Sequence, residues 1–315
     1  MAYSVIFPGQ GSQEVGMGKE FLDKFGVARE VFDLVDESLG YKLSKIILEG
    51  PEEELKKTEN AQPAIMTLSI AIFETLRKEM GIKLEPKCVA GHSLGEYTAL
   101  VAAGTLTLGD GVRLVHVRGK LMQEAVPLGR GAMAAILGLD KETINDICKD
   151  ISSVGVCEAA NYNDPGQIVI SGEKEAIEKA IKIAKERGAR RAILLKVSAP
   201  FHCSLMKPVA EKLRKEFEKY TWLSPKWPLV ANVSAETEDD VEKIQDSLYK
   251  QTFMPVLWSA SVKKMAEMGV NSFVEIGPGA VLSGLVKRTI KGAKTVAIRT
   301  PDDVPMLKEF ISLEE

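Results

Sequence analysis

The sequence has few cysteines, few histidines and no long apolar run. Its 315 residues include four cysteines, without C-x-x-C spacing or the density of a disulfide framework, and this usage is typical of a reducing compartment. No stretch approaches the length of a membrane span, and the first residues lack a basic start followed by a long apolar run. We therefore expect a complete, cytoplasmic protein that does not act in a membrane.

The chain also lacks a strong excess of charge of either sign. It has 41 Lys and Arg against 44 Asp and Glu, for a formal net charge of -3, so nothing global indicates a nucleic-acid partner or an anionic membrane surface. Hydrophobic residues make up 45% and charged residues 27% of the chain, which is ordinary for a soluble globular protein. A chain of this length predicts one large domain with a smaller companion.

What the sequence does contain is a glycine-flanked serine, in the stretch Gly91-His92-Ser93-Leu94-Gly95. This stretch follows an apolar segment over 88–90 and precedes a helix of small residues over 96–103. A sharp strand-to-helix turn requires neighbours without bulk, and the two glycines supply them. A serine there suits a nucleophile, because nearby backbone N–H groups and the helix dipole favour an oxyanion. The alternative is a glycine-lined turn with a solvated serine.

Strand and helix patterns alternate along most of the chain. An apolar strand over 4–7 leads into a glycine-rich loop, Gly9–Gln13, whose spacing matches neither the dinucleotide-binding nor the Walker pattern. Alternation with mostly buried strands predicts an α/β fold, a parallel sheet covered by helices. The other elements expected in this part are helices over 18–38, 52–57, 63–80 (opening with Pro63), 110–126, 204–220, 239–250, 259–268 and 280–290, and strands over 229–233 and 272–276.

A different pattern occupies the middle of the chain. It predicts a strand (131–139), a helix capped by Asp140 (to 151), a strand (154–160), a turn (161–166), a strand (167–171), a helix (173–187) and a strand (189–197). That βαββαβ order is the ferredoxin-like unit. We expect it as a small domain, residues 126–197, inserted into a large α/β catalytic domain formed by residues 1–125 and 198–315. The cleft between two such domains is a natural ligand site.

Arg118 lies on the apolar face of the helix expected over 110–126. Its neighbours at helical spacing are Leu114, Val115, Leu121 and Met122. A buried guanidinium is costly unless an anion meets it, and its planar fork suits a carboxylate. The alternative is an arginine that reaches water or pairs with a structural Asp or Glu.

The chain has three histidines, so each can be weighed as a base for the serine. His92 adjoins Ser93 on the turn, where adjacent side chains diverge, and we expect it to pack structurally. His116 has polar helical neighbours, and we expect it to be exposed. His202 lies in a proline-containing loop before a helix, where the dipole disfavours imidazolium and keeps the ring available as a base. A capping or packing histidine is the alternative for His202.

Five motifs stand out along the chain: Pro8–Gln13, Gly91–Gly95, Val117–Gly119 with Met122 and Gln123, Pro200–His202, and Gln251 with Pro255 and Val256. Taken together, they resemble those of the malonyl-CoA:acyl carrier protein transacylases. They occur in the family's order, and the match extends from the first strand to Gly277-Pro278-Gly279, nearly the whole chain. The resemblance implies a hydrolase-like parallel-sheet domain joined to a ferredoxin-like one.

The resemblance also implies roles for particular residues. Ser93 would be the nucleophile and His202 its base, with the backbone carbonyl of Gln251 orienting the histidine in place of an acid. The backbone N–H groups of Gln10 and Leu94 would form the oxyanion hole. Arg118 would pair with the malonyl carboxylate, and Met122 and Phe201 would contribute to substrate binding. Ala199 departs from the histidine that often begins the family's malonyl-selective signature.

The implied reaction is ping-pong transfer of malonyl from malonyl-CoA, through a malonyl-serine, to the phosphopantetheine thiol of acyl carrier protein. We expect it to need no metal or redox cofactor and to serve fatty-acid biosynthesis. Two basic tracts could receive an acidic carrier protein: Lys287, Arg288, Lys291, Lys294 and Arg299, and Lys182, Lys185, Arg187, Arg190 and Arg191. The alternatives are a serine hydrolase acting on thioesters and a non-catalytic relative that only binds carrier protein or CoA.

Overall fold

A six-stranded sheet forms the centre of the larger part of the molecule. The computed structural model describes residues 2–127, 129–197 and 199–312, so the expected domain boundary at residue 198 falls outside the described residues. Neighbouring strands pair in parallel, except for the short antiparallel pair β7 and β8. In sheet order the strands are β10 (Lys294–Ile298), β9 (Val270–Ile276), β1 (Ala2–Phe7), β2 (Cys88–Gly91), β7 (Leu229–Val230) and β8 (Thr237–Glu238).

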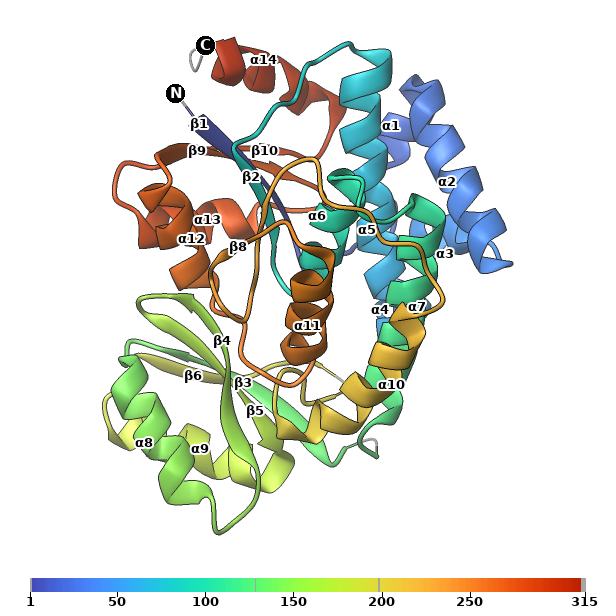
Figure 1. Cartoon of the computed structure of the whole chain (residues 1–315). Coiled ribbons are helices and arrows are strands. Elements are labelled where there is room, and N and C mark those ends of the chain that lie inside the picture. The colour runs from blue at the N-terminus through green and yellow to red at the C-terminus, as the bar shows by residue number, and fades with distance from the viewer. Residues whose placement is uncertain (1, 128, 198, 313–315) are drawn as a thin grey trace.

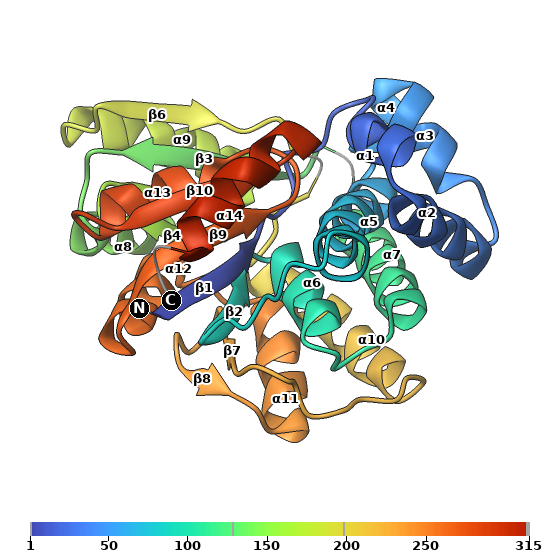
Figure 2. The same cartoon turned by 90° about the horizontal axis from the view of Figure 1, so that it is seen from above.

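Helices cover both faces of this sheet (Figures 1 and 2). Alternate residues of β1 enter different cores: Val5 and Phe7 join the core with α5 and α7, whereas Ile6 joins the core with α12 and α13. Burial on both faces explains why this strand is a continuous apolar run. The helices of this part are α1 (Lys19–Lys24), α2 (Gly26–Leu39), α3 (Leu43–Glu49), α4 (Glu52–Lys56), α5 (Thr58–Glu74), α6 (Leu94–Ala102), α7 (Leu108–Glu124), α10 (Lys207–Phe217), α11 (Val241–Gln251), α12 (Trp258–Glu267), α13 (Val281–Thr289) and α14 (Val304–Ser312).

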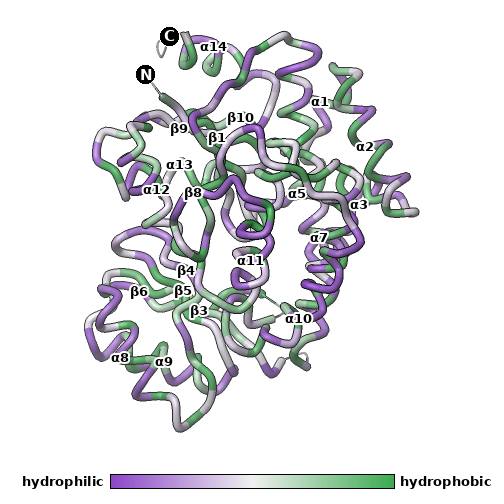
Figure 3. The backbone as a smooth tube through the Cα atoms, in the orientation of Figure 1, coloured by the Kyte–Doolittle hydropathy of each residue, from purple (hydrophilic) through white to green (hydrophobic). Residues whose placement is uncertain are grey.

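The outer helices have one buried face each. In α2 the buried residues recur at helical spacing, at Ala28, Val31, Phe32 and Val35. Figure 3 shows hydrophobic and hydrophilic residues alternating along this helix. The pattern that predicted a helix is therefore the pattern that packs it onto the core.

The middle of the chain forms a separate antiparallel sheet, with α8 and α9 covering one face (Figure 1). Asp140 caps α8 as expected, since its side chain accepts a hydrogen bond of 2.8 Å from the backbone N of Thr143. The sheet order is β4-β5-β3-β6. In chain order the elements are β3 (Gly131–Leu137), α8 (Lys141–Ile151), β4 (Cys157–Asp164), β5 (Gln167–Glu173), α9 (Lys174–Glu186) and β6 (Arg191–Leu194).

The expected turn over 161–166 is wrong, because β4 continues to Asp164. The hairpin needs only Pro165 and Gly166, and the Asp164 side chain accepts a bond of 2.8 Å from the backbone N of Gly166. Long-range contacts keep the preceding residues extended. The backbone N of Tyr162 donates to the carbonyl of Val256 at 2.9 Å, and the N of Val256 donates to the carbonyl of Ala160 at 2.8 Å. These two bonds join the edge of the small sheet to the larger part.

The expected helix start at Pro63 is also wrong, because α5 begins at Thr58 and Pro63 lies inside it. Proline has no N–H to donate to the carbonyl four residues before it. That carbonyl, on Glu59, instead contacts His116 Nδ1 at 2.9 Å. His116, which we expected to be exposed, is therefore half-buried.

Two further boundaries differ from expectation near the N-terminus. The helix expected over 18–38 is interrupted at Phe25, whose backbone is extended, so that α1 and α2 are separate helices. The short helix α3 was not expected. Helix α5 gives way after Glu74 to a π-helical turn, Thr75–Glu79. None of these differences moves the glycine-flanked serine from its place between β2 and α6.

The turn that carries this serine lies directly against the end of β1. A Cβ added at Gly91 would lie 1.9 Å from the backbone carbonyl of Gly95, and one added at Gly95 would lie 2.1 Å from the carbonyl oxygen of Phe7. Both contacts are with backbone, which cannot rotate away as a side chain could. The glycines at these two positions are therefore required by close approach.

We expect Gly95→Ala to lower the free energy of unfolding by about 3 kcal/mol or more, because the new methyl group would force the turn away from β1. Urea and thermal unfolding would measure this loss. Gly26→Ala is a matched control, since a Cβ there would meet side-chain atoms at 3.8 Å and 3.9 Å only. It should be neutral or stabilising by at most about 1 kcal/mol. A Gly95→Ala protein as stable as the wild type would contradict the close approach.

Candidate active site

Ser93 occupies a strained position at the start of α6. Its φ is 52°, in the left-handed region that side-chain-bearing residues rarely adopt. The Asn232 side chain holds this backbone in place: its Oδ1 accepts from the N of Ser93 at 2.8 Å, and its Nδ2 donates to the carbonyl of Gly91 at 2.7 Å. The strand-to-helix turn therefore presents the serine hydroxyl in a fixed direction.

His202 lies within hydrogen-bond distance of that hydroxyl, although it is 109 residues away in sequence. Ser93 Oγ and His202 Nε2 are 2.7 Å apart, and His202 Nδ1 lies 2.7 Å from the backbone carbonyl of Gln251, at the end of α11. Because a carbonyl can only accept, Nδ1 carries the proton of the neutral ring, and Nε2 accepts from the serine. His202 is thus placed to receive the hydroxyl proton.

The surroundings keep this imidazole neutral. Burial, and to a lesser extent the positive charge of Arg118, lower the pKa of His202 to about 3. The hydrogen bond to the Gln251 carbonyl acts in the opposite direction and raises this pKa. His202, like Ser93, has a positive φ, of 57°. The loop over 199–203 therefore fixes the backbone of His202, and with it the position of the ring beside the serine.

Arg118 is 1% exposed and lies beside the same hydroxyl. Its Nη1 donates to Gln62 Oε1 at 2.7 Å, while its Nη2 donates to Gln251 Oε1 at 2.9 Å and to Ser93 Oγ at 3.2 Å. All three partners are neutral, and Arg118 Nε has none within the described residues. Among the residues that the structure describes, Arg118 also forms no ion pair. Burial lowers its pKa, and an anion beside the serine would supply the missing charge.

The backbone donors expected for the oxyanion hole border the serine. Leu94 is the first residue of α6. The loop containing Gln10 packs on the turn, since a Cβ at Gly9 would lie 2.6 Å from the carbonyl oxygen of His92. Among the hydrogen bonds of the described residues, none uses the backbone N–H of Gln10 or Leu94. Both groups are available to an oxygen atom of a ligand.

Met122 and Phe201, the two residues expected to contribute to substrate binding, are both buried. Met122 is 1% exposed, and its sulfur accepts a weak hydrogen bond of 3.8 Å from Nε2 of Gln62, the residue that also contacts Arg118. Phe201 is 8% exposed and precedes His202 in the loop. The structure thus brings Ser93, His202, Gln251 and Arg118 into direct contact. Met122 is linked to this group through Gln62.

Sequence reasoning missed a buried carboxyl group beneath this site. Glu96 is fully buried, and it accepts bonds from Gln251 Nε2 at 2.7 Å and from the backbone N of Asn232 at 3.2 Å. Burial raises its pKa to about 8. The same Gln251 nitrogen donates to the carbonyl of Ser93 at 2.8 Å. Glu96 could have been found, because a charged residue in an otherwise apolar helix indicates a buried polar role. No feature of the sequence singles out Gln62 or Asn232.

Glu158 connects the small sheet to the segment that follows His202. Its carboxylate accepts from the backbone N of Ser204 at 2.8 Å and from Ser204 Oγ at 2.7 Å. Across the described residues no cluster of three or more His, Cys, Asp or Glu side chains could hold a metal ion. Nor does a helix of that part have the length and apolarity to cross a membrane.

The class of protein follows from the sheet and this site together. A serine on a strand-to-helix turn, paired with a neutral histidine and bordered by free backbone N–H groups, has the arrangement of nucleophilic acyl transfer. A family model described as acyl transferase domain matches residues 4–307. A Bacillus subtilis protein named malonyl CoA-acyl carrier protein transacylase is 48% identical over 310 residues, covering 98% of this chain and 97% of its own. An Escherichia coli protein of the same name is 46% identical over 299 residues, covering 95% and 96%.

Solved structures agree with the sequence relatives. An acyl-carrier-protein-S-malonyltransferase from Bartonella henselae superposes with a TM-score of 0.96 at 44% identity, covering 99% of this chain and 100% of its own. A malonyl-transacylase in complex with its type II PKS acyl-carrier protein gives 0.95 at 43% identity, covering 98% and 99%. The chain therefore belongs to the acyl transferase family, and within it to the malonyl CoA-acyl carrier protein transacylases.

We expect the rate of serine acylation to hold nearly constant as the pH falls from 7 to 5. The reason is that His202, with a pKa of about 3, stays unprotonated throughout this range. The measurement is the pH profile of kcat/KM for the acyl donor. An acid limb centred near pH 6.5, the value of an ordinary histidine, would contradict the neutral, buried base.

The lowered pKa of His202 also makes the folded protein less stable at acid pH. Below the unfolded pKa of 6.5 the unfolded chain binds a proton that folded His202 does not, so stability is complete above that pH and falls below it. The loss is about 2 kcal/mol at pH 5. His202→Gln should remove this part of the acid destabilisation, as measured by urea unfolding at pH 7 and pH 5.

Proposed function

We propose that this protein transfers the malonyl group of malonyl-CoA to the phosphopantetheine thiol of an acyl carrier protein, through an ester on Ser93. Relatives similar over nearly their full length carry the name of this reaction. The observation that supports a malonyl donor is Arg118, a buried guanidinium with only neutral partners, one of which is the serine hydroxyl. A serine hydrolase for uncharged acyl groups would have no use for such a cation.

In the proposed first half-reaction, His202 accepts the proton of Ser93 Oγ as the oxygen attacks the thioester carbonyl. The Gln251 carbonyl holds the ring in the required tautomer and stabilises the imidazolium that forms. The N–H groups of Gln10 and Leu94 donate to the oxyanion of the tetrahedral intermediate. CoA then leaves as its thiol, taking the proton from His202, and malonyl-serine remains.

In the second half-reaction the carrier-protein thiol gives its proton to His202 and attacks the ester carbonyl. The bond between that carbon and Ser93 Oγ then breaks, Ser93 Oγ takes the proton back from His202, and the malonyl thioester is released. Arg118 holds the free carboxylate of the malonyl group throughout, and Met122 and Phe201 line the space beside it. No atom changes oxidation state, so the proposal requires neither a metal nor a redox cofactor. Burial of the site favours transfer to the thiol over hydrolysis.

The proposed domain organisation follows the two sheets. Residues 126–197 would form a ferredoxin-like small domain inserted into the hydrolase-like domain of residues 1–125 and 198–315, with Val256 and Glu158 making bonds between them. We place the protein in the cytoplasm, a location that its four free cysteines favour. Its product would serve fatty-acid biosynthesis.

We expect brief mixing with malonyl-CoA, in the absence of carrier protein, to add one malonyl group to the protein. Intact-mass spectrometry measures the adduct, and peptide mapping should place it on Ser93. Ser93→Ala should give no adduct. If CoA is released catalytically while no adduct accumulates, the protein is a hydrolase and the transfer proposal is overturned.

We expect Arg118→Ala to shift the preference for malonyl-CoA over acetyl-CoA by at least about tenfold toward acetyl-CoA. The variant loses a charge-assisted pair worth about 1.5–3 kcal/mol. The ratio of the two acylation rates is the proper measurement, since loss of the bond to Ser93 Oγ would slow both donors.

Arg113→Ala is the matched control on the same helix, because Arg113 is half-exposed and paired with Asp110 at the surface. It should leave the preference unchanged. If Arg118→Ala also leaves the preference for malonyl-CoA over acetyl-CoA unchanged, Arg118 does not bind the carboxylate. This conclusion would hold even if the protein still transferred malonyl.

A further inference from the structure

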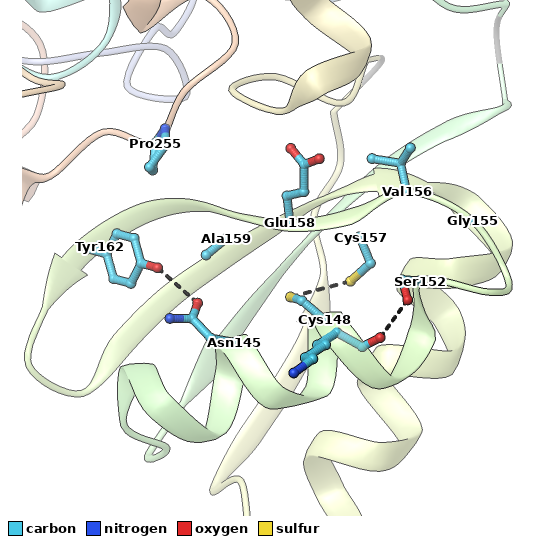
Figure 4. A pocket seen from close by; sticks show the side chains of 11 residues that line it. Asn145, Cys148, Ser152, Gly155, Val156, Cys157, Glu158, Ala159, Tyr162 and Pro255 are labelled. Carbon is cyan, nitrogen blue, oxygen red and sulfur yellow. Dashed lines mark hydrogen bonds between the residues drawn. The ribbon is translucent and has the colours of Figure 1, made fainter.

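A cavity of about 550 Å³ lies outside the serine site, between α8 and β4. Pro255 borders it from the larger part, and neither Ser93 nor His202 lines it. Two of its lining residues are cysteines, Cys148 on α8 and Cys157 on β4 (Figure 4). The proposed transfer reaction assigns no task to this cavity.

The side chains of these two cysteines point toward each other (Figure 4). Their sulfur atoms are 3.6 Å apart, with the Cys157 thiol donating to Cys148. Cys148 is 9% exposed and Cys157 is 5% exposed. The donated bond lowers the pKa of Cys148 and raises that of Cys157, so the pair has one sulfur suited to be a thiolate and one suited to remain a thiol.

The other two cysteines provide a contrast within the same chain. Cys88 and Cys203 are fully buried, and burial raises the pKa of each to about 11. The Cys203 thiol donates to the carbonyl of Pro200 at 3.2 Å, and neither residue lines the cavity. A soluble oxidant can therefore reach one pair of thiols, while the remaining two are protected by position and by protonation.

We propose that Cys148 and Cys157 form a dithiol site that a peroxide oxidises to an intramolecular disulfide. The Cys148 thiolate attacks one oxygen of hydrogen peroxide, the O–O bond breaks, and a sulfenic acid forms with release of hydroxide. The sulfur of Cys157 then attacks the sulfenic sulfur, the S–O bond breaks, and the S–S bond forms. In total, two thiols and one hydrogen peroxide give one disulfide and two waters.

The first test treats the full-length protein with one equivalent of hydrogen peroxide and then alkylates it in denaturant. Alkylation should fall from the four thiols of the chain to two, and dithiothreitol should restore all four. Trypsin cuts after Lys149, so the peptides carrying Cys148 and Cys157 should appear as one cross-linked pair. Four alkylated thiols, sulfinic acid without a cross-link, or a cross-link through Cys88 or Cys203 would overturn the proposal.

Variants make the test specific. Cys203→Ser, the matched control, should still lose two of its three remaining thiols, whereas Cys148→Ser and Cys157→Ser should form no intramolecular disulfide. Thermal unfolding of each variant verifies that it is folded. A disulfide that survives in either single variant would show that another pair is oxidised.

A second measurement does not depend on disulfide formation. Phenylarsine oxide, a trivalent arsenical, condenses with two neighbouring thiols and releases one water. Intact mass should show one phenylarsenic group per chain in the wild type and in Cys203→Ser, and none in Cys148→Ser or Cys157→Ser. Absence of the adduct in the folded wild-type protein would contradict a reachable dithiol pair.

Discussion

The close approach of one backbone turn to the end of β1 is the constraint on which the rest of the site depends. Gly95 packs against the carbonyl of Phe7 and Gly91 packs against Gly95, so closely that no Cβ fits at either position. This contact sets where α6 begins, and hence where the Ser93 hydroxyl and the N–H of Leu94 lie. It also brings the loop after β1, with Gln10, beside the serine. Close packing thereby places the Ser93 hydroxyl and the N–H of Leu94 beside the loop that contains Gln10.

A network of buried polar groups then completes the site. Gln251 is its centre: the backbone carbonyl orients His202, while the side chain joins Arg118, Glu96 and the backbone of Ser93. Such groups are costly to bury unless each finds partners. Arg118 is the member whose charge has no opposite charge bonded to it within the described residues. A substrate carboxylate beside the serine would supply that opposite charge.

Several hydrogen bonds join the small sheet to the larger part, among them one of 2.6 Å from Arg288 Nε to Asp164 Oδ2. Val256 continues the edge of β4 with two backbone hydrogen bonds, and Glu158 holds the segment after His202. The bond from the backbone N of Tyr162 to the carbonyl of Val256 depends on β4 running past residue 160, where turn-forming residues had predicted its end. The Asn163 side chain, buried on this extension, contacts His92 beside the serine at 2.8 Å. Tertiary contacts there outweigh local turn preference.

Features that depend on neighbouring residues could be predicted from the amino-acid sequence. The glycine-flanked serine, the alternation of buried strands with helices, the order of elements in the small sheet, and the position of Arg118 on the apolar face of its helix could all be predicted, and the family was confirmed. The packing of distant elements accounts for the rest, which includes the partners of Arg118, the burial of Glu96, the bond from the Ser93 backbone N–H to Asn232, and the facing thiols of Cys148 and Cys157. Those contacts join residues that no local pattern relates, because they depend on how separate elements pack.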